Sequence, residues 1–177
     1  YIFADLPDIG YSTDIDTVMA SSYQVKKQLQ QIVKIEQPIT NTLLYKRILR
    51  IWNLTRVTTR LQVFIDNLLE DAYKDPLSGD TIIYWEDEEK AKDCDFYRIN
   101  SKRDILDIPI LEVMSAARYA IEQQISMPTE DLKRLTSQLL GFSRKGNNLD
   151  MVTEQTIQLL IDQGIFSHAN GMVSMNN

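Results

Sequence analysis

"NTLLYKRILRIWNLTRVTTRL", residues 41–61, contains the clearest structural pattern of the chain. Its first part carries an apolar stripe at the spacing of an α-helix, formed by Leu43, Leu44, Ile48 and Ile51. Thr40 stands just before this stripe, where its hydroxyl can cap the helix. "NLTRVTT" then breaks the period, and a second apolar stripe starts at Leu61. The stretch therefore predicts two helices joined by a short turn.

The flanking residues extend this pair of helices into a unit. "YQVKKQLQQIVKIEQ" (23–37) has a helical track that includes Glu36, and Pro38 ends it. Further on, "TIIYW" (81–85) and "DFYRI" (95–99) are rich in β-forming residues. They predict a hairpin with a long acidic connection. Residues 1–22 show no sustained period, and we interpret them as an N-terminal arm or linker that packs on another part.

The second half of the chain repeats this order. Helical patterns occur in residues 108–125, 128–140 and 149–163, and Asn170-Gly171 predicts a short hairpin. A shift of 88 positions superimposes landmarks of the two halves: Leu44 on Leu132, Ile51 on Leu139, Trp52 on Leu140, Leu54 on Phe142, Thr55 on Ser143, Arg56 on Arg144, Leu61 on Leu149 and Leu69 on Ile157. We interpret this pattern as a weak duplication.

The sequence thus predicts a mainly α-helical protein with small β-hairpins, built from two tandem winged-helix-like (helix-turn-helix) units. We expect the arm over residues 1–22, the first unit with its long acidic wing loop over 23–108, and the second unit over 109–177. In each unit three helices would bury a small core, and the hairpin, called the wing, would cover one end of the helices.

The composition is that of a globular protein, with 44% hydrophobic and 25% charged residues. No apolar run approaches the roughly 18 residues that a membrane span needs, and no signal-peptide pattern occurs. The single cysteine, Cys94, cannot form an internal disulfide, which fits a reducing compartment. We therefore expect a cytoplasmic protein without membrane contact. Because the sequence starts with Tyr, we also expect it to be a piece of a longer protein.

Few residues point to catalysis. His168, the only histidine, lies in the predicted final turn, where a solvated loop residue is expected more than a base or a ligand. "EDEE" (86–89) could hold a divalent cation, but an acidic run is usually a solvated loop. The sequence has no P-loop, no G-x-G-x-x-G and no Cys/His cluster at metal-ligand spacing. We expect no enzyme activity, cofactor, metal or small-molecule substrate for this chain.

Positive charge gathers in one region although the net charge is −6. Residues 40–61 contain no acid and five cations: Lys46, Arg47, Arg50, Arg56 and Arg60. A phosphate at the start of the helix after the turn would meet free N–H groups, threonine hydroxyls and guanidinium groups. In helix-turn-helix modules this helix enters the major groove. The candidate nucleic-acid-binding residues are these five cations with Thr59, and Arg144 and Lys145 in the second half.

Other interpretations of the same residues stay open. Arg56 and Arg144 occupy matching places, and each could instead brace its turn by bonding the last carbonyls of the preceding helix. Lys46, Arg47 and Arg50 could form a plain solvated face. The second unit is the weaker candidate, because residues 109–177 hold five basic and seven acidic residues.

Several blocks resemble a known bacterial family, the domain of unknown function number 3320. The family pattern has an Ile-Val pair, a Glu-x-Pro-Ile/Val block, Leu-x-x-Arg, and a turn made of an aliphatic residue, Ser or Thr, and Arg. In this chain these are Ile32-Val33, Glu36/Pro38/Ile39, Leu44 to Arg47, and Leu54-Thr55-Arg56. "LLGFSRKG" (139–146), "LIDQGIF" (160–166) and "YIFADLPDIG" (1–10) are also similar to it. Asn53 stands where the family favours Gly, and since Asn tolerates the left-handed conformation we expect the turn to be kept.

In such proteins the domain closes a large superfamily I helicase-like chain, often with a restriction-endonuclease-like domain. The resemblance implies these upstream domains of the parent chain as partners, and their ATPase and nuclease residues are not in this sequence. We expect a non-catalytic DNA-binding or DNA-positioning module that holds the DNA phosphate backbone. The alternative is a protein–protein docking module of the same machine, using the acidic arm and "EDEEKAKDCD" (86–95) without nucleic-acid contact.

Overall fold

The computed structural model describes residues 1–10, 13–75, 81–92, 94–99 and 103–176. The described residues are mainly helical, with 55% in helices, and they form two small antiparallel sheets of three strands each. This confirms the predicted fold class at that level. The chain divides into two compact units, Ile2–Asp93 and Cys94–Asn177 with Tyr1, called here the N-terminal and the C-terminal unit. No helix in the described ranges is long and apolar enough to cross a membrane.

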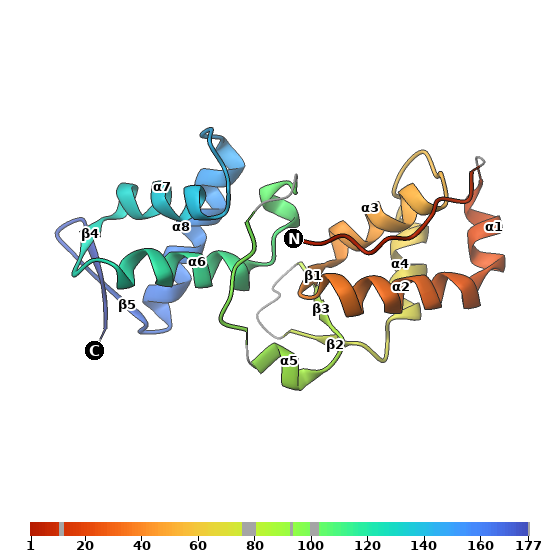
Figure 1. Cartoon of the computed structure of the whole chain (residues 1–177), viewed down its shortest axis with the longest axis horizontal. Helices are drawn as coiled ribbons and strands as arrows, with labels where there is room; N and C mark the ends of the chain where they lie inside the picture. The colour runs from red at the N-terminus through yellow and green to blue at the C-terminus, as the bar shows by residue number, and fades with distance from the viewer. Residues whose placement is uncertain (11–12, 76–80, 93, 100–102, 177) are drawn as a thin grey trace. The chain divides into compact units, whose positions relative to one another are not determined.

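The N-terminal unit packs three main helices on a small sheet (Figure 1). In chain order its elements are α1 (Ile15–Ala20), α2 (Ser22–Glu36), β1 (Ile39–Thr40), α3 (Asn41–Ile51), α4 (Thr59–Leu68), β2 (Tyr73–Lys74), β3 (Ile83–Trp85) and α5 (Glu88–Lys92). Strand β3 lies between β1 and β2 and is antiparallel to both. Thr40 caps α3 as predicted, because its hydroxyl accepts the N–H of Leu43 at 3.2 Å. The predicted apolar stripes become the core of this unit.

The N-terminal arm contains a short helix, α1, and is bonded to the N-terminal unit along its length. The N–H of Ala4 donates to Glu36 Oε1 at 2.9 Å, and the N–H of Ile9 donates to the carbonyl of Ile51 at 3.0 Å. The hydroxyl of Thr13 donates to the carbonyl of Trp52. The arm therefore follows α3 to its C-terminal end.

The predicted pairing of "TIIYW" with "DFYRI" is wrong. Strand β3 pairs with β2, Tyr73 lying opposite Trp85, and residues 95–99 are not in a strand. The indole N–H of Trp85 donates to the buried carboxylate of Asp75 at 3.2 Å, which ties the end of β2 to β3. Part of the connection between these strands (76–80) lies outside the described residues.

The acidic segment is consequently not a wing loop. It follows β3 and forms the short helix α5. Lys90 pairs with Glu86, and Lys92 pairs with Glu88 at 2.9 Å, both at i,i+4 spacing. Opposite charges at this spacing favour a helix, which is the physical reason that the acidic run is helical instead of a loop.

The C-terminal unit has the same order of main elements (Figure 1). After a 3₁₀ turn at Ile105–Asp107 come α6 (Ile110–Glu122), β4 (Met127–Pro128), α7 (Thr129–Leu139), α8 (Asn147–Asp162), β5 (Phe166–Ala169) and β6 (Met172–Met175). Strand β6 lies between β4 and β5. The hairpin predicted at Asn170-Gly171 is confirmed, with positive φ angles of 54° and 77°. His168 is an exposed residue of β5, opposite Val173, and not part of the turn.

Element boundaries recur at the spacing that aligns the sequence landmarks. Helix α3 spans residues 41–51 and α7 spans 129–139, so both ends differ by 88 positions. Strands β1 and β4 and the starts of α4 and α8 differ by the same number. Leu44 and Leu132 are both fully buried. Leu61 is also fully buried, and its counterpart Leu149 is 7% exposed. The apolar residues of these two aligned pairs are therefore buried in both units.

Candidate nucleic-acid interface

The turn between α3 and α4 is closed by backbone hydrogen bonds. Asn53 has a positive φ of 51°, as its position in the sequence predicts. Its N–H donates to the carbonyl of Arg50 at 3.2 Å, and the N–H of Leu54 donates to that of Leu49 at 2.9 Å. This pair of bonds is a Schellman motif, which satisfies the last carbonyls of a helix.

The turn between α7 and α8 has the same bonds 88 residues later. Gly141, with φ 89°, donates its N–H to Gln138 at 2.9 Å, and Phe142 donates its N–H to Ser137 at 3.0 Å. In the described residues neither Arg56 nor Arg144 makes a hydrogen bond or an ion pair, and both are exposed. The main chain, and not an arginine, therefore occupies the carbonyls that bracing would use.

A polar cluster fixes α4 relative to α3 and the sheet. The hydroxyl of Tyr45 donates to Asp66 Oδ1 at 2.7 Å, and that of Tyr84 donates to the same oxygen at 3.0 Å. Burial, together with the carboxylate of Asp66, raises the pKa of both tyrosines. The hydroxyls therefore stay protonated and donate to Asp66. These bonds hold α4 against α3 and β3, on either side of the turn.

The start of α4 has donors that could meet an anion. Thr58 caps the helix, its hydroxyl accepting the N–H of Leu61 at 3.2 Å. The N–H groups of Thr59 and Arg60 have no acceptor among the described residues, and both side chains are exposed. Free N–H groups at a helix N-terminus attract anions. Two of the predicted residues are thus placed at the end of a helix that favours negative charge.

The remaining predicted cations of the N-terminal unit differ in their surroundings. Lys46 and Arg50 are exposed on α3, at i,i+4 spacing. Arg56 is exposed in the turn. Arg60 lies 2.8 Å from Asp16 of α1, and both side chains are more than half exposed, so this ion pair is weakly stabilising.

Arg47 is engaged within the unit. Its side chain is only 11% exposed, and its Nε lies 3.0 Å from the fully buried carboxylate of Glu36. It also donates to the carbonyl of Ala4 and lies over the ring of Phe3. Arg47 therefore anchors the arm. The signal was present in the sequence, because Glu36 lies on the buried track of its helix, where a carboxylate needs a partner.

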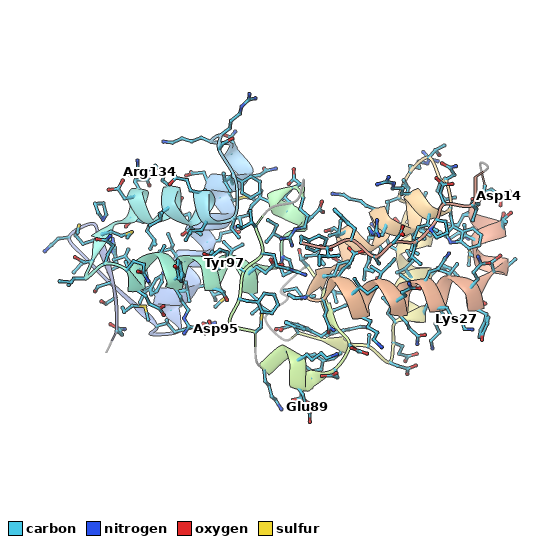
Figure 2. All side chains as sticks on the ribbon, in the orientation of Figure 1. Asp14, Lys27, Glu89, Asp95, Tyr97 and Arg134 are labelled. Atoms are coloured by element: carbon cyan, nitrogen blue, oxygen red, sulfur yellow. The ribbon has the colours of Figure 1, made fainter. Side chains whose placement is uncertain are left out.

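The second turn opens onto a pocket of about 450 Å³ between α7 and α8. Its lining includes Arg134, Ser143, Arg144, Lys145, Gly146 and Asn147. Gly146, the N-cap of α8, has no side chain to cap the helix. Arg144 and Lys145 are exposed, and Figure 2 labels Arg134 on α7. Cations and an uncapped helix start thus lie together here too.

Acidic residues interleave with the cations of this pocket. Lys133, 7% exposed at its side chain, contacts Asp150 at 2.7 Å and both Glu130 and Glu154 at 3.3 Å. Burial opposes the charged form, but these three carboxylates raise its pKa well above its usual value. Arg134 pairs with Asp131 at 2.8 Å. Less positive charge is therefore available at the second turn than at the first.

The comparisons with known proteins bear on the N-terminal unit alone. Residues 19–63, from the end of α1 to within α4, match the family described as "Protein of unknown function (DUF3320)". The match includes α3, the first turn, the start of α4 and all five cations of residues 40–61. The resemblance to domain of unknown function 3320 is thus supported over this segment. No curated protein and no solved structure matches the chain.

Proposed function

We propose that this chain is a non-catalytic module that binds or positions DNA through its phosphate backbone. The main support is the surface around the first turn, which exposes four cations: Lys46, Arg50, Arg56 and Arg60. They belong to α3, the turn and the start of α4, where backbone N–H groups have no acceptor among the described residues. Cations and helix N-termini are the groups that hold phosphates in protein–DNA complexes. We also propose the cytoplasm as its location and, from the family resemblance, a helicase/nuclease-like parent protein.

We further propose that both units are winged-helix-like and arose as a tandem repeat. The support is their shared order of helix, strand, helix, helix, strand, strand, with the first strand pairing with the last. The 88-residue offset and the two equal Schellman turns add to it. In such a module α4 would be the helix presented to the DNA groove. Lys46 and Arg50 on α3 would then contact the flanking phosphates.

The test is duplex DNA binding measured by fluorescence anisotropy over a range of salt concentrations. Each phosphate contact contributes about 0.9 to the negative slope of log affinity against log salt. The double substitution Arg56→Ala/Arg60→Ala removes two exposed cations, so we expect the slope to become shallower by about 1.8. A wild-type protein that does not bind at low salt would contradict the proposal.

The matched control is Lys26→Ala/Lys27→Ala on α2, which removes the same charge from a different part of the N-terminal unit. Lys26 and Lys27 interact with Asp71 and Tyr23 within the unit. If this control flattens the slope as much as the turn variant does, binding depends on overall charge and the proposed site is wrong.

The second candidate is a protein-docking module of the same machine. Exposed Glu89 on α5 favours it, since this carboxylate forms no ion pair with the described residues and could meet a basic partner. In that case DNA would not bind, and the upstream domains of the parent chain would be the ligands.

A further inference from the structure

A pocket in the C-terminal unit lies apart from both turns and has an aromatic lining. Its volume is about 290 Å³, just under the range of pockets that hold drug-sized ligands, which suits a ligand of side-chain size. The segment 94–99 contributes Asp95, Phe96 and Tyr97 to the lining. Figure 2 labels Asp95 and Tyr97 on this segment. The other lining residues come from α6.

One face of α6 forms the second wall. Ser115, Arg118, Tyr119 and Glu122 follow each other at i, i+3, i+4 and i+7, so they share one stripe of the helix. The opposite face of α6 is packed in the core through Ala117, Ala120 and Ile121. Arg118, Tyr119 and Glu122 of the lining stripe therefore lie outside this core.

The aromatic side chains remain accessible. Phe96 is 40% and Tyr119 is 47% exposed. The rings of Tyr97 and Tyr119 lie 5.8 Å apart between centroids and are inclined by 53°, so they form two sides of a corner. Burial, with the neighbouring Tyr119, raises the pKa of Tyr97 and keeps its hydroxyl neutral. The corner thus presents π-faces without adding a phenolate charge.

The charges of the lining favour a cation. Arg118 lies 3.5 Å from Asp95, and these two charges balance. Glu122 is exposed and forms no ion pair with the described residues, so one negative charge remains. Aromatic faces attract cations electrostatically, and a nearby carboxylate strengthens that attraction. A nucleotide would bring its phosphate towards this carboxylate and is disfavoured.

We propose that this pocket binds the side chain of an arginine from a partner protein. The guanidinium would lie against Tyr119 and pair with Glu122, since the ring of Phe96 already has the guanidinium of Arg98 over it. Arginine fits better than lysine because its planar, weakly hydrated group stacks on aromatic faces. The C-terminal unit would therefore dock a basic protein segment, a role independent of DNA binding at the first turn.

The test is an NMR titration of the whole chain with the peptide acetyl-Gly-Arg-Gly-amide. We expect millimolar binding with shifts in the ring signals of Tyr97 and Tyr119. The same peptide with citrulline, which keeps the shape without the charge, should cause no comparable shift. Tyr119→Ala and Glu122→Gln should each weaken binding by about fivefold, whereas Tyr23→Ala, at an exposed tyrosine of α2, should not.

Several outcomes would overturn this assignment. Equal binding of the citrulline peptide would show apolar stacking alone. Ring shifts produced by oligo-dT but not by the arginine peptide would make the pocket a base-binding site. If the signals of α6 show a folded protein and millimolar peptide causes no shift, the pocket does not bind arginine. Glu122→Gln keeps the shape of an exposed side chain, so its effect does not depend on folding.

Discussion

The two units end their second main helix with the same backbone turn but place different charges around it. After α3 the turn is followed by exposed Arg56 and Arg60, and among the described residues the one acid that pairs with either of them is Asp16 of the arm, with Arg60. After α7, the carboxylates of Glu130 and Asp150 lie beside the cations of the pocket. The backbone turn is thus the same in both units, and the charged side chains around it set its electrostatic potential.

Each unit also uses a buried glutamate to hold the segment that precedes its helices. Glu36 accepts the N–H of Ala4 and pairs with Arg47. Glu112, fully buried on α6, accepts the N–H of Arg98 at 3.0 Å and pairs with both Arg98 and Arg103. The C-terminal unit thus surrounds one carboxylate with two guanidinium groups, and its stability should depend more on that carboxylate.

The largest expected effect comes from Glu112→Gln. Removing one partner of a buried ion pair leaves a charge unpaired, which costs about 3–5 kcal/mol of unfolding free energy. Both tryptophans of the chain, Trp52 and Trp85, lie in the N-terminal unit. Tryptophan fluorescence reports the N-terminal unit, so the urea transition that it follows should change little in Glu112→Gln. Far-UV circular dichroism reports the helices of both units, and part of its transition should move to lower urea concentration. Glu122→Gln, an exposed position on the same helix, is the control.

Glu112→Gln should also change how the stability of the C-terminal unit depends on pH. Burial would raise the pKa of Glu112, but its bonds with Arg98 and Arg103 lower it below the ordinary value of 4.5. The stabilisation is therefore present above about pH 4.5 and is lost as the pH falls through the lowered pKa. In the wild type the C-terminal unit should lose stability in that acidic range. A pH dependence that is identical in Glu112→Gln would contradict this role of the ion cluster.

A smaller effect is expected at the left-handed position that closes each turn. Gly141→Val forces a β-branched residue to a φ of 89°, which costs about 1–2 kcal/mol. Gly141→Asn should cost much less, since Asn53 occupies the matching position with φ 51°. Hydrogen exchange of α7 and α8 would measure both variants. Equal losses for Val and Asn would show that the two turns are not equivalent.

Much of this architecture could be predicted from the sequence, because it depends on local signals. The helical stripes, the cap at Thr40 and the Asn170-Gly171 turn each follow from residues close together in the chain. The pairing of β3 could not, since strands of two or three residues carry almost no pattern and their register depends on tertiary bonds such as that of Trp85 to Asp75.

The candidate site was predictable only in part, for a related reason. The concentration of cations in residues 40–61 was visible, but the separate role of Arg47 depends on Glu36, which lies on another helix. The aromatic pocket was missed because Tyr97 and Tyr119 are brought together by the packing of an extended segment on α6. Contacts between residues far apart in the chain produce no recognisable pattern in the sequence.

The smallest expected effects concern the caps of α4 and α8. Thr58→Ala removes the hydroxyl that accepts the N–H of Leu61 and should cost about 1 kcal/mol. Gly146→Ser adds a hydroxyl at the uncapped start of α8 and should stabilise by a few tenths of a kcal/mol. An added Cβ at Gly146 meets open space, so the substitution is free of clashes. Thermal unfolding compares the two changes, and a loss of stability in Gly146→Ser would be inconsistent with this account.

The two Schellman turns also have an evolutionary consequence. Main-chain bonds complete each helix end. Among the described residues, the exposed side chains that follow form no hydrogen bond or ion pair: Thr55 and Arg56 in the N-terminal unit, Ser143 and Arg144 in the C-terminal unit. Mutations there can alter charge without a penalty in stability. The charge around each turn can therefore change independently of the other, so one unit can acquire a ligand while the other diverges.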